Sequence, residues 1–275
     1  MPARINHNVH LKQVHRNLSL HAAESAKHIG QLASGRRVER SSDDPASLSL
    51  ANGIRSEIIA LSEGTRNIQQ SISMLQVADG AMGEINNMIR RMSNLAAQSA
   101  NFTYNDSDRL SINQEFQQLK LEIDRIANST SYNGVVLLKE PNLFIIQVGP
   151  TDTSNDVSRV TIDDMRASGP KLNVGATSIN TVADARAALP ELERALNVVI
   201  NERNRIGAFQ NRLEMAIRTS DRVIERMSDS ESSIRDADLA KSVTALSSSQ
   251  ILAQTAASFA IEADLDIERV LSLLQ

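Results

Sequence analysis

The side chains best suited to chemistry are the histidines, and all five lie within the first 28 residues. On a helix, His7, His10, His21 and His28 fall on one side, but only His7 and His10 are close along the axis, because His10 and His21 would be about 16 Å apart. A zinc site needs several ligands around one ion, and the sequence contains no HExxH motif. The spacing favours a polar edge or a contact surface over a metal centre.

Other catalytic constellations find no support. The acidic pairs Asp43-Asp44 and Asp163-Asp164 precede a predicted helix and lie in a predicted turn, so capping and solvation explain them better than acid–base catalysis. The serine run at 247–249 has no histidine after it, and the GxSxG, GxxxxGK[ST] and GxGxxG motifs are absent. The absence of cysteine excludes disulfides, thiolate metal sites and cysteine nucleophiles. We expect neither catalysis nor a cofactor.

The composition is typical of a helical assembly. The 275 residues are 41% hydrophobic but only 3% aromatic, so packing must rely on Leu, Ile, Val, Met and Ala. The net charge of −4 gives no support to nucleic-acid binding. No apolar run is long enough for a membrane span, and the first residues lack the apolar core of a secretory signal. If the protein leaves the cytoplasm, we expect a route that cleaves no such peptide.

Apolar residues at steps of three, four and seven predict one long helix from about Pro45 to about Ala100, roughly 80 Å in length. A chain with such a helix is expected to be a rod, and Ser42 or Asp43 is expected to cap it. Further helices are predicted after the loop at 101–106, from Thr181 onward and from Leu239 to Leu274. Pro190 either starts the third of these or kinks it. The first 33 residues are also predicted to be helical, with one apolar stripe: Leu11, Val14, Leu18, Ala22, Ile29 and Leu32.

The middle of the chain has a different pattern. Short runs of β-branched residues between Val135 and Ile162 predict two or three strands, and residues 163–180 are predicted to form a loop. The arginines between Arg203 and Arg226 alternate with acids, which is typical of a face lined with salt bridges. The predicted fold class is mainly α: an elongated antiparallel helical hairpin or coiled-coil bundle with a small β region in the middle of the chain.

Both ends of the sequence resemble bacterial flagellins. The matching stretches of the first half are INHN at 5–8, LASGRRVERSSDDPASLSLANGIRSEI at 32–58, NLAAQSAN at 94–101 and LEIDRIANSTSYNG at 121–134. Those of the second half are IGAFQNRLEMAI at 206–217, SSIRDADLA at 232–240, SQILAQTAASFA at 249–260 and VLSLLQ at 270–275. Together they cover roughly residues 1–140 and 185–275, and only about 40 residues separate the two halves. The resemblance is to a short form without variable outer domains.

The resemblance implies a structural subunit that polymerises into the flagellar filament for motility and is exported unfolded through the flagellar type III system. Residues 1–44 and 236–275 would pair as a terminal coiled coil in the inner core of the filament. Residues 45–235 would form a rod-like helical bundle with the β region at about 135–180. The expected contacts of the terminal coiled coil involve Leu11, Val14, Leu18, Ile29, Leu32, Leu246, Ala253, Ala260, Val270, Leu271 and Leu274.

The resemblance also implies partners. These are many copies of the same chain and the flagellar cap, junction and export-chaperone proteins, with no nucleic acid and no membrane insertion. Arg91, Ser93, Leu95 and Glu115 correspond to a surface through which some flagellins engage a Toll-like receptor, but Ser93 replaces an arginine typical of recognised members, which weakens that prediction. The filament is expected outside the cell, with a periplasmic flagellum as the alternative.

Three alternatives and one hypothesis accompany this interpretation. The chain could be a hook–filament junction protein, a minor flagellin or a free-standing coiled-coil adaptor. An adaptor would stay soluble when seeded with flagellar fragments, whereas a flagellin would elongate them. If the two ends of the chain meet, basic and histidine side chains face an acidic run, and polymerisation would depend on pH as histidine titrates. The residues concerned are Arg4, His7, His10 and Lys12 at one end, and Glu262, Asp264, Asp266 and Glu268 at the other.

Overall fold

The computed structural model describes residues 9–272, and within them the chain forms five helices and four short strands. The helices are α1 (Val9–Ser34), α2 (Pro45–Ser99), α3 (Asp106–Ser129), α4 (Val182–Arg235) and α5 (Leu239–Ser272). The strands are β1 (Ser131–Tyr132), β2 (Val135–Val136), β3 (Asn142–Gln147) and β4 (Val157–Ile162). The fold is mainly α with a small β region, as predicted. None of the described helices is long and apolar enough to cross a membrane.

The chain divides into two compact units, each formed by segments that are distant in sequence. Unit 1 comprises residues 1–58 and 225–275, and unit 2 comprises residues 59–224. The division falls inside α2 and α4, so each of these helices contributes to both units. The inner-core and rod-like roles predicted for 1–44 with 236–275 and for 45–235 remain a prediction.

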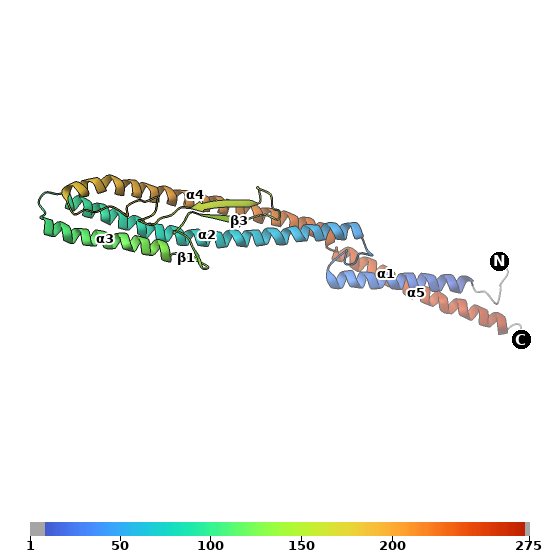
Figure 1. Cartoon of the computed structure of the whole chain (residues 1–275). Helices are drawn as coiled ribbons and strands as arrows, with labels where there is room; N and C mark the ends of the chain where they lie inside the picture. Colours follow the sequence, from blue (N-terminus) through green and yellow to red (C-terminus); the bar gives the residue numbers. More distant parts are fainter. Residues whose placement is uncertain (1–8, 273–275) are drawn as a thin grey trace. The chain divides into compact units, whose positions relative to one another are not determined.

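Unit 2 contains the main hydrophobic core. In Figure 1, α3 and α4 lie along α2, with the β region beside them. Most of the apolar stripe of α2 between Ile68 and Met92 is completely buried, with Ile72 only partly so, which explains why its apolar residues recur with the period of a helix. The core contains few aromatic side chains, and its largest buried members are Phe116, Ile68, Leu75, Met82, Ile85, Ile89, Met92, Ile123, Leu137, Leu138, Ile162 and Met165.

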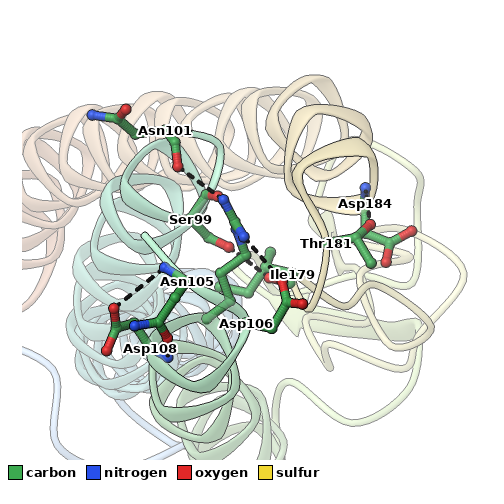
Figure 2. Close-up of polar contacts among 9 residues, drawn as sticks. Ser99, Asn101, Asn105, Asp106, Asp108, Ile179, Thr181 and Asp184 are labelled. Atoms are coloured by element: carbon green, nitrogen blue, oxygen red, sulfur yellow. Dashed lines mark hydrogen bonds and ion pairs between the residues drawn. The ribbon is translucent and has the colours of Figure 1, made fainter. Parts of the chain in front are cut away.

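Polar side chains fix the starts of the helices. The predicted cap of α2 was wrong by one or two residues: Asp44, and neither Ser42 nor Asp43, accepts the amide of Ser47, while Asp43 accepts those of Glu39 and Arg40. At α3, Asn105 and Asp108 cap each other's backbone amides (Figure 2). At α4, Thr181 accepts the amide of Asp184. The helix therefore begins before Pro190, which lies inside it.

The β region consists of two antiparallel pairs. Asn133 and Gly134, with φ angles of 50° and 80°, form the two-residue turn between β1 and β2. Strands β3 and β4 form a longer hairpin in which Asn142 pairs with Ile162. The end of this hairpin contacts α2 at Gly64, where an added Cβ would lie 2.7 Å from the carbonyl carbon of Val148. Glycine is required there because any side chain would collide with the hairpin backbone.

Residues 163–180 form a loop, as predicted, but a closely packed one. Met165, Ala167, Leu172, Val174 and Ile179 are buried in the core of unit 2. Hydrogen bonds to carbonyl groups of the loop attach it to the helices. Lys120 Nζ of α3 donates to the carbonyl of Gly175 at 2.5 Å and to that of Thr177 at 3.0 Å. Ser99 Oγ of α2 donates to the carbonyl of Ile179 at 2.6 Å.

Candidate assembly surface

The two terminal helices of unit 1, α1 and α5, lie side by side and run antiparallel (Figure 1). On α1, the residues that lose most exposure follow an alternating spacing of three and four: Leu11, Val14, Leu18, His21, Ser25, His28 and Leu32. On α5 the corresponding set is Ser242, Leu246, Ser249, Ala253, Ala256 and Ala260. These two sets form the pairing face. Because the spacing is that of a coiled coil, the helices stay in contact along their length.

The pairing face is small and polar at its centre. Ser25 Oγ donates a 2.9 Å hydrogen bond to Ser249 Oγ, and Ser249 is only 4% exposed. Alanine and serine dominate the α5 side, and each of these side chains buries less apolar area than a leucine or isoleucine would. A contact of this kind fixes register while contributing modest stability.

The structure places most of the predicted coiled-coil residues on this face. Leu11, Val14, Leu18 and Leu32 of α1 and Leu246, Ala253 and Ala260 of α5 are partly buried there. The predicted stripe was wrong at two positions, because Ala22 is exposed and Ile29 is 52% exposed. His21, Ser25 and His28 take that part of the face, which an apolar pattern by itself does not indicate. The side chains of Val270 and Leu271, and the whole of Leu274, lie outside the described residues.

The charge hypothesis for the chain ends falls largely outside the described part of the chain as well. Arg4 and His7 precede it, and the side chains of His10, Asp264, Asp266 and Glu268 are not described. Lys12 and Glu262 are exposed. The hypothesis remains a prediction.

Large apolar side chains are exposed on the remaining surface of both terminal helices. Each of them is at least half exposed, and the group includes an aromatic ring on α5. Its members are Val9, Leu20 and Ile29 on α1, and Leu239, Val243, Ile251, Leu252, Phe259 and Ile261 on α5. We call these nine residues the outer apolar set. So many exposed apolar side chains on two adjacent helices are typical of a surface that another chain covers.

Backbone contacts close the base of the helix pair. The amide of Arg37 donates to the carbonyl of Arg235 at 2.7 Å, and the amide of Ala237 donates to that of Gly35 at 2.9 Å. Gly35 has a φ of 68°, a conformation that suits the residue following α1. Val38 is almost completely buried beside this junction. The ends of α1 and α4 and the start of α5 are therefore held together within unit 1.

Only some of the four residues predicted to form a receptor surface are exposed. Arg91 and Glu115 are about half exposed and form an ion pair at 2.6 Å that joins α2 to α3. Ser93 is half-buried, but Leu95 is only 2% exposed and belongs to the core. Leu95 therefore supports the helix from beneath and does not contribute to an exposed surface as predicted.

The charged groups of unit 2 serve internal contacts. The predicted salt-bridged face of α4 is present in part: Arg205 pairs with Glu202 at 2.5 Å and Arg218 with Glu214 at 3.9 Å, whereas Arg203 pairs at 2.8 Å with Asp79 of α2. Glu202 is 5% exposed, and its burial raises the pKa of the carboxyl group although Arg205 and the amide of Asp163 favour the charged form. Burial also disfavours the charged form of Lys120, and it therefore lowers the pKa of the ammonium group. Among the described residues no group of His, Asp and Glu could hold a metal ion.

Long amphipathic helices, a small-residue pairing face and an outer apolar set together define a subunit of a helical polymer. Comparison with known proteins agrees. The family profile for the bacterial flagellin N-terminal helical region matches residues 5–142, and that for the C-terminal helical region matches residues 189–274. The chain therefore belongs to the bacterial flagellin family, whose members are structural filament proteins and not enzymes.

Individual relatives extend over nearly the whole chain. A flagellin of Halalkalibacterium halodurans is 34% identical over 272 residues, which cover 98% of this chain and 99% of that protein. The flagellar filament 31.3 kDa core protein of Treponema maltophilum is 32% identical over 286 aligned residues, with the same coverage. The crystal structure of Bacillus cereus flagellin, 33% identical, superimposes with a TM-score of 0.50 over 56% of this chain and 88% of that one. The protein is thus a structural subunit of a flagellar filament.

Proposed function

We propose that the terminal helix pair carries polymerisation, with the outer apolar set of one copy packing against neighbouring copies in the filament. The observation that carries this proposal is the arrangement of unit 1: the pairing face between α1 and α5 has a polar centre and an α5 side made mostly of alanine and serine, while nine further large apolar residues are exposed outside it. Burying one isoleucine or phenylalanine side chain contributes about 1.5–3 kcal/mol, so nine such residues can drive assembly of a pair that is weakly stabilised alone.

Seeded elongation tests this proposal. Ile251→Ser and Phe259→Ser replace two members of the outer apolar set, and Gln254→Ser changes an exposed polar residue of the same helix. Each apolar substitution should raise the critical concentration about 10- to 100-fold, because its burial energy is lost, while Gln254→Ser should behave like the parent protein. Elongation of both apolar variants at the parent critical concentration would refute the proposal.

We further propose that the filament is extracellular and that the subunit reaches it unfolded through the flagellar type III route, with export-chaperone, cap and junction proteins as transient partners. Support comes from the flagellins among the relatives. The alternative is a periplasmic flagellum. Antibody labelling of intact cells distinguishes the two, because only an external filament is reached without breaking the outer membrane.

Recognition by a Toll-like receptor is proposed to be weak. Arg91 and Glu115 are accessible, but Ser93 stands where recognised relatives carry arginine. A reporter-cell assay with monomeric protein should show little response for the parent chain and a larger one for Ser93→Arg. A strong parent response would show that Ser93 does not limit recognition.

A further inference from the structure

Two histidines lie on the pairing face between α1 and α5, one on each side of its serine contact. His21 and His28 are half-buried, and they lie one heptad apart on either side of Ser25, whose hydroxyl bonds to Ser249. His15, in contrast, is exposed and lies off the face. Histidine is the side chain that most commonly acts as a pH switch in proteins.

The facing helix offers no charge to compensate a protonated histidine. Residues 242–261 of α5 contain no Asp, Glu, Lys or Arg, and the nearest charged residues of that helix are Lys241 and Glu262 at the two ends of this segment. Because Ser25 meets Ser249, the residues of α5 beside His21 and His28 are the alanines, serines and leucines of the pairing face. A positive charge against such a surface loses hydration without gaining a partner.

The two histidines differ in what their own helix provides. His21 Nδ1 lies 3.2 Å from Glu24 Oε2, so a protonated ring there has an anionic partner. His28 Nδ1 lies 3.1 Å from Gln31 Oε1, a neutral acceptor. The segments at this end of the pair carry both signs of charge: Lys27 pairs with Asp43 at 3.5 Å, and the basic residues Arg36, Arg37 and Lys241 are accompanied by the acidic residues Glu39, Asp44, Asp236 and Asp238. What distinguishes His28 is that its hydrogen-bond partner, Gln31, is neutral.

We propose that His28 makes the terminal helix pair, and with it the filament, sensitive to mild acid: protonation of His28 weakens the contact between α1 and α5. His21 contributes less, because Glu24 compensates its charge. The inference rests on the proposed role of the helix pair in polymerisation. It reverses the direction of the earlier charge hypothesis, in which histidine protonation strengthens contacts between the chain ends.

Depolymerisation of preformed filaments between pH 7.5 and pH 5.5 tests the proposal. The concentration of subunits in equilibrium with parent filaments should rise about tenfold over this range, because a half-buried charge with a neutral hydrogen-bond partner weakens the contact between the helices. In His28→Gln the rise should be less than about twofold, because the neutral amide keeps the polar contact with Gln31. His15→Gln is the matched control and should retain the parent profile, and Glu24→Gln should steepen it by removing the partner of His21.

The outcomes separate the two proposals. If the subunit concentration of the parent does not change with pH, or if His28→Gln leaves its pH profile unchanged, the proposed role of His28 is wrong. The assembly surface is tested independently by the serine variants of Ile251 and Phe259. If those serine variants elongate normally, the assembly proposal fails, whatever the pH profile. Far-UV circular dichroism of each filament at pH 7.5 verifies that the substitutions leave the helices intact.

Discussion

Gly64 should be the least replaceable glycine of helix α2. An added Cβ would lie 2.7 Å from the carbonyl carbon of Val148, and the nearest atoms belong to the backbone of the β3–β4 hairpin. Backbone atoms cannot rotate away as a flexible side chain would. In Gly64→Ala the hairpin must move away from α2, which strains the 3.3 Å hydrogen bond from Asn67 Nδ2 to the carbonyl of Gln147. Overpacking of this kind costs about 1–3 kcal/mol.

Gly80 provides a matched control in the same helix and the same unit. An added Cβ there meets nothing within 4 Å. Replacing a mid-helix glycine by alanine in open space stabilises a helix by about 0.5–1 kcal/mol, and this gain applies to both positions. Gly80→Ala should therefore be more stable than the parent chain, and Gly64→Ala should be less stable than Gly80→Ala by about 1–3 kcal/mol.

Urea unfolding of the unseeded full-length chain, followed by far-UV circular dichroism, measures this difference. With an m-value of about 2 kcal/mol/M, the midpoints of the two variants should differ by about 0.5–1.5 M. Equal midpoints would refute the reasoning, because they would mean that the hairpin is not held against α2 at Gly64. A changed m-value in Gly64→Ala alone would indicate that the hairpin has detached from the helix.

Two further predictions concern buried charges in unit 2. Burial raises the pKa of the Glu202 carboxyl group, so the folded protein binds a proton at this group more tightly than the unfolded chain does. The charged carboxylate therefore lowers the free energy of unfolding at pH 7. This loss of stability is relieved as the pH falls through the raised pKa toward the unfolded value of about 4.3. Glu202→Gln should flatten the urea midpoint between pH 7.5 and pH 4.5, and an unchanged slope would contradict this. Lys120→Met should lower the free energy of unfolding by about 1–3 kcal/mol, because the carbonyls of Gly175 and Thr177 lose their donor. Lys139→Met, at an exposed position, is its control, and equal effects of the two substitutions would argue against the loop anchor.

The long helices could be predicted from the sequence because their apolar residues repeat with the period of a helix. Helix α2 begins at Pro45 and ends at Ser99, within one residue of the prediction. The strands were predicted from β-branched runs between turn residues, and β3 and β4 confirm the two longer runs. Both signals are local, so neighbouring residues in the sequence suffice to read them.

The packed loop at 163–180 could not be predicted in the same way. Its anchors are contacts over long sequence separations, such as that of Lys120 with Gly175 and that of Ser99 with Ile179. A lysine in a helix gives no local signal that its ammonium group will bind two loop carbonyls. The structure alone identifies Lys120, Ser99 and Gly64 as residues that hold the β region and its loop on the helices.

The error on α1 has a physical origin that bears on function. Apolar residues were assigned to the face between α1 and α5, yet Ile29 is exposed while His28 and Ser25 are partly buried there. In a chain that folds alone, the most apolar face turns inward because nothing else can cover it. In a subunit that polymerises, two faces compete, and the larger apolar area can be kept for the contact with neighbouring copies. Under the proposed function, a pairing face with a polar centre and an outer apolar set would leave the helix pair weakly stabilised until it assembles, and folding of the pair would be coupled to growth of the filament.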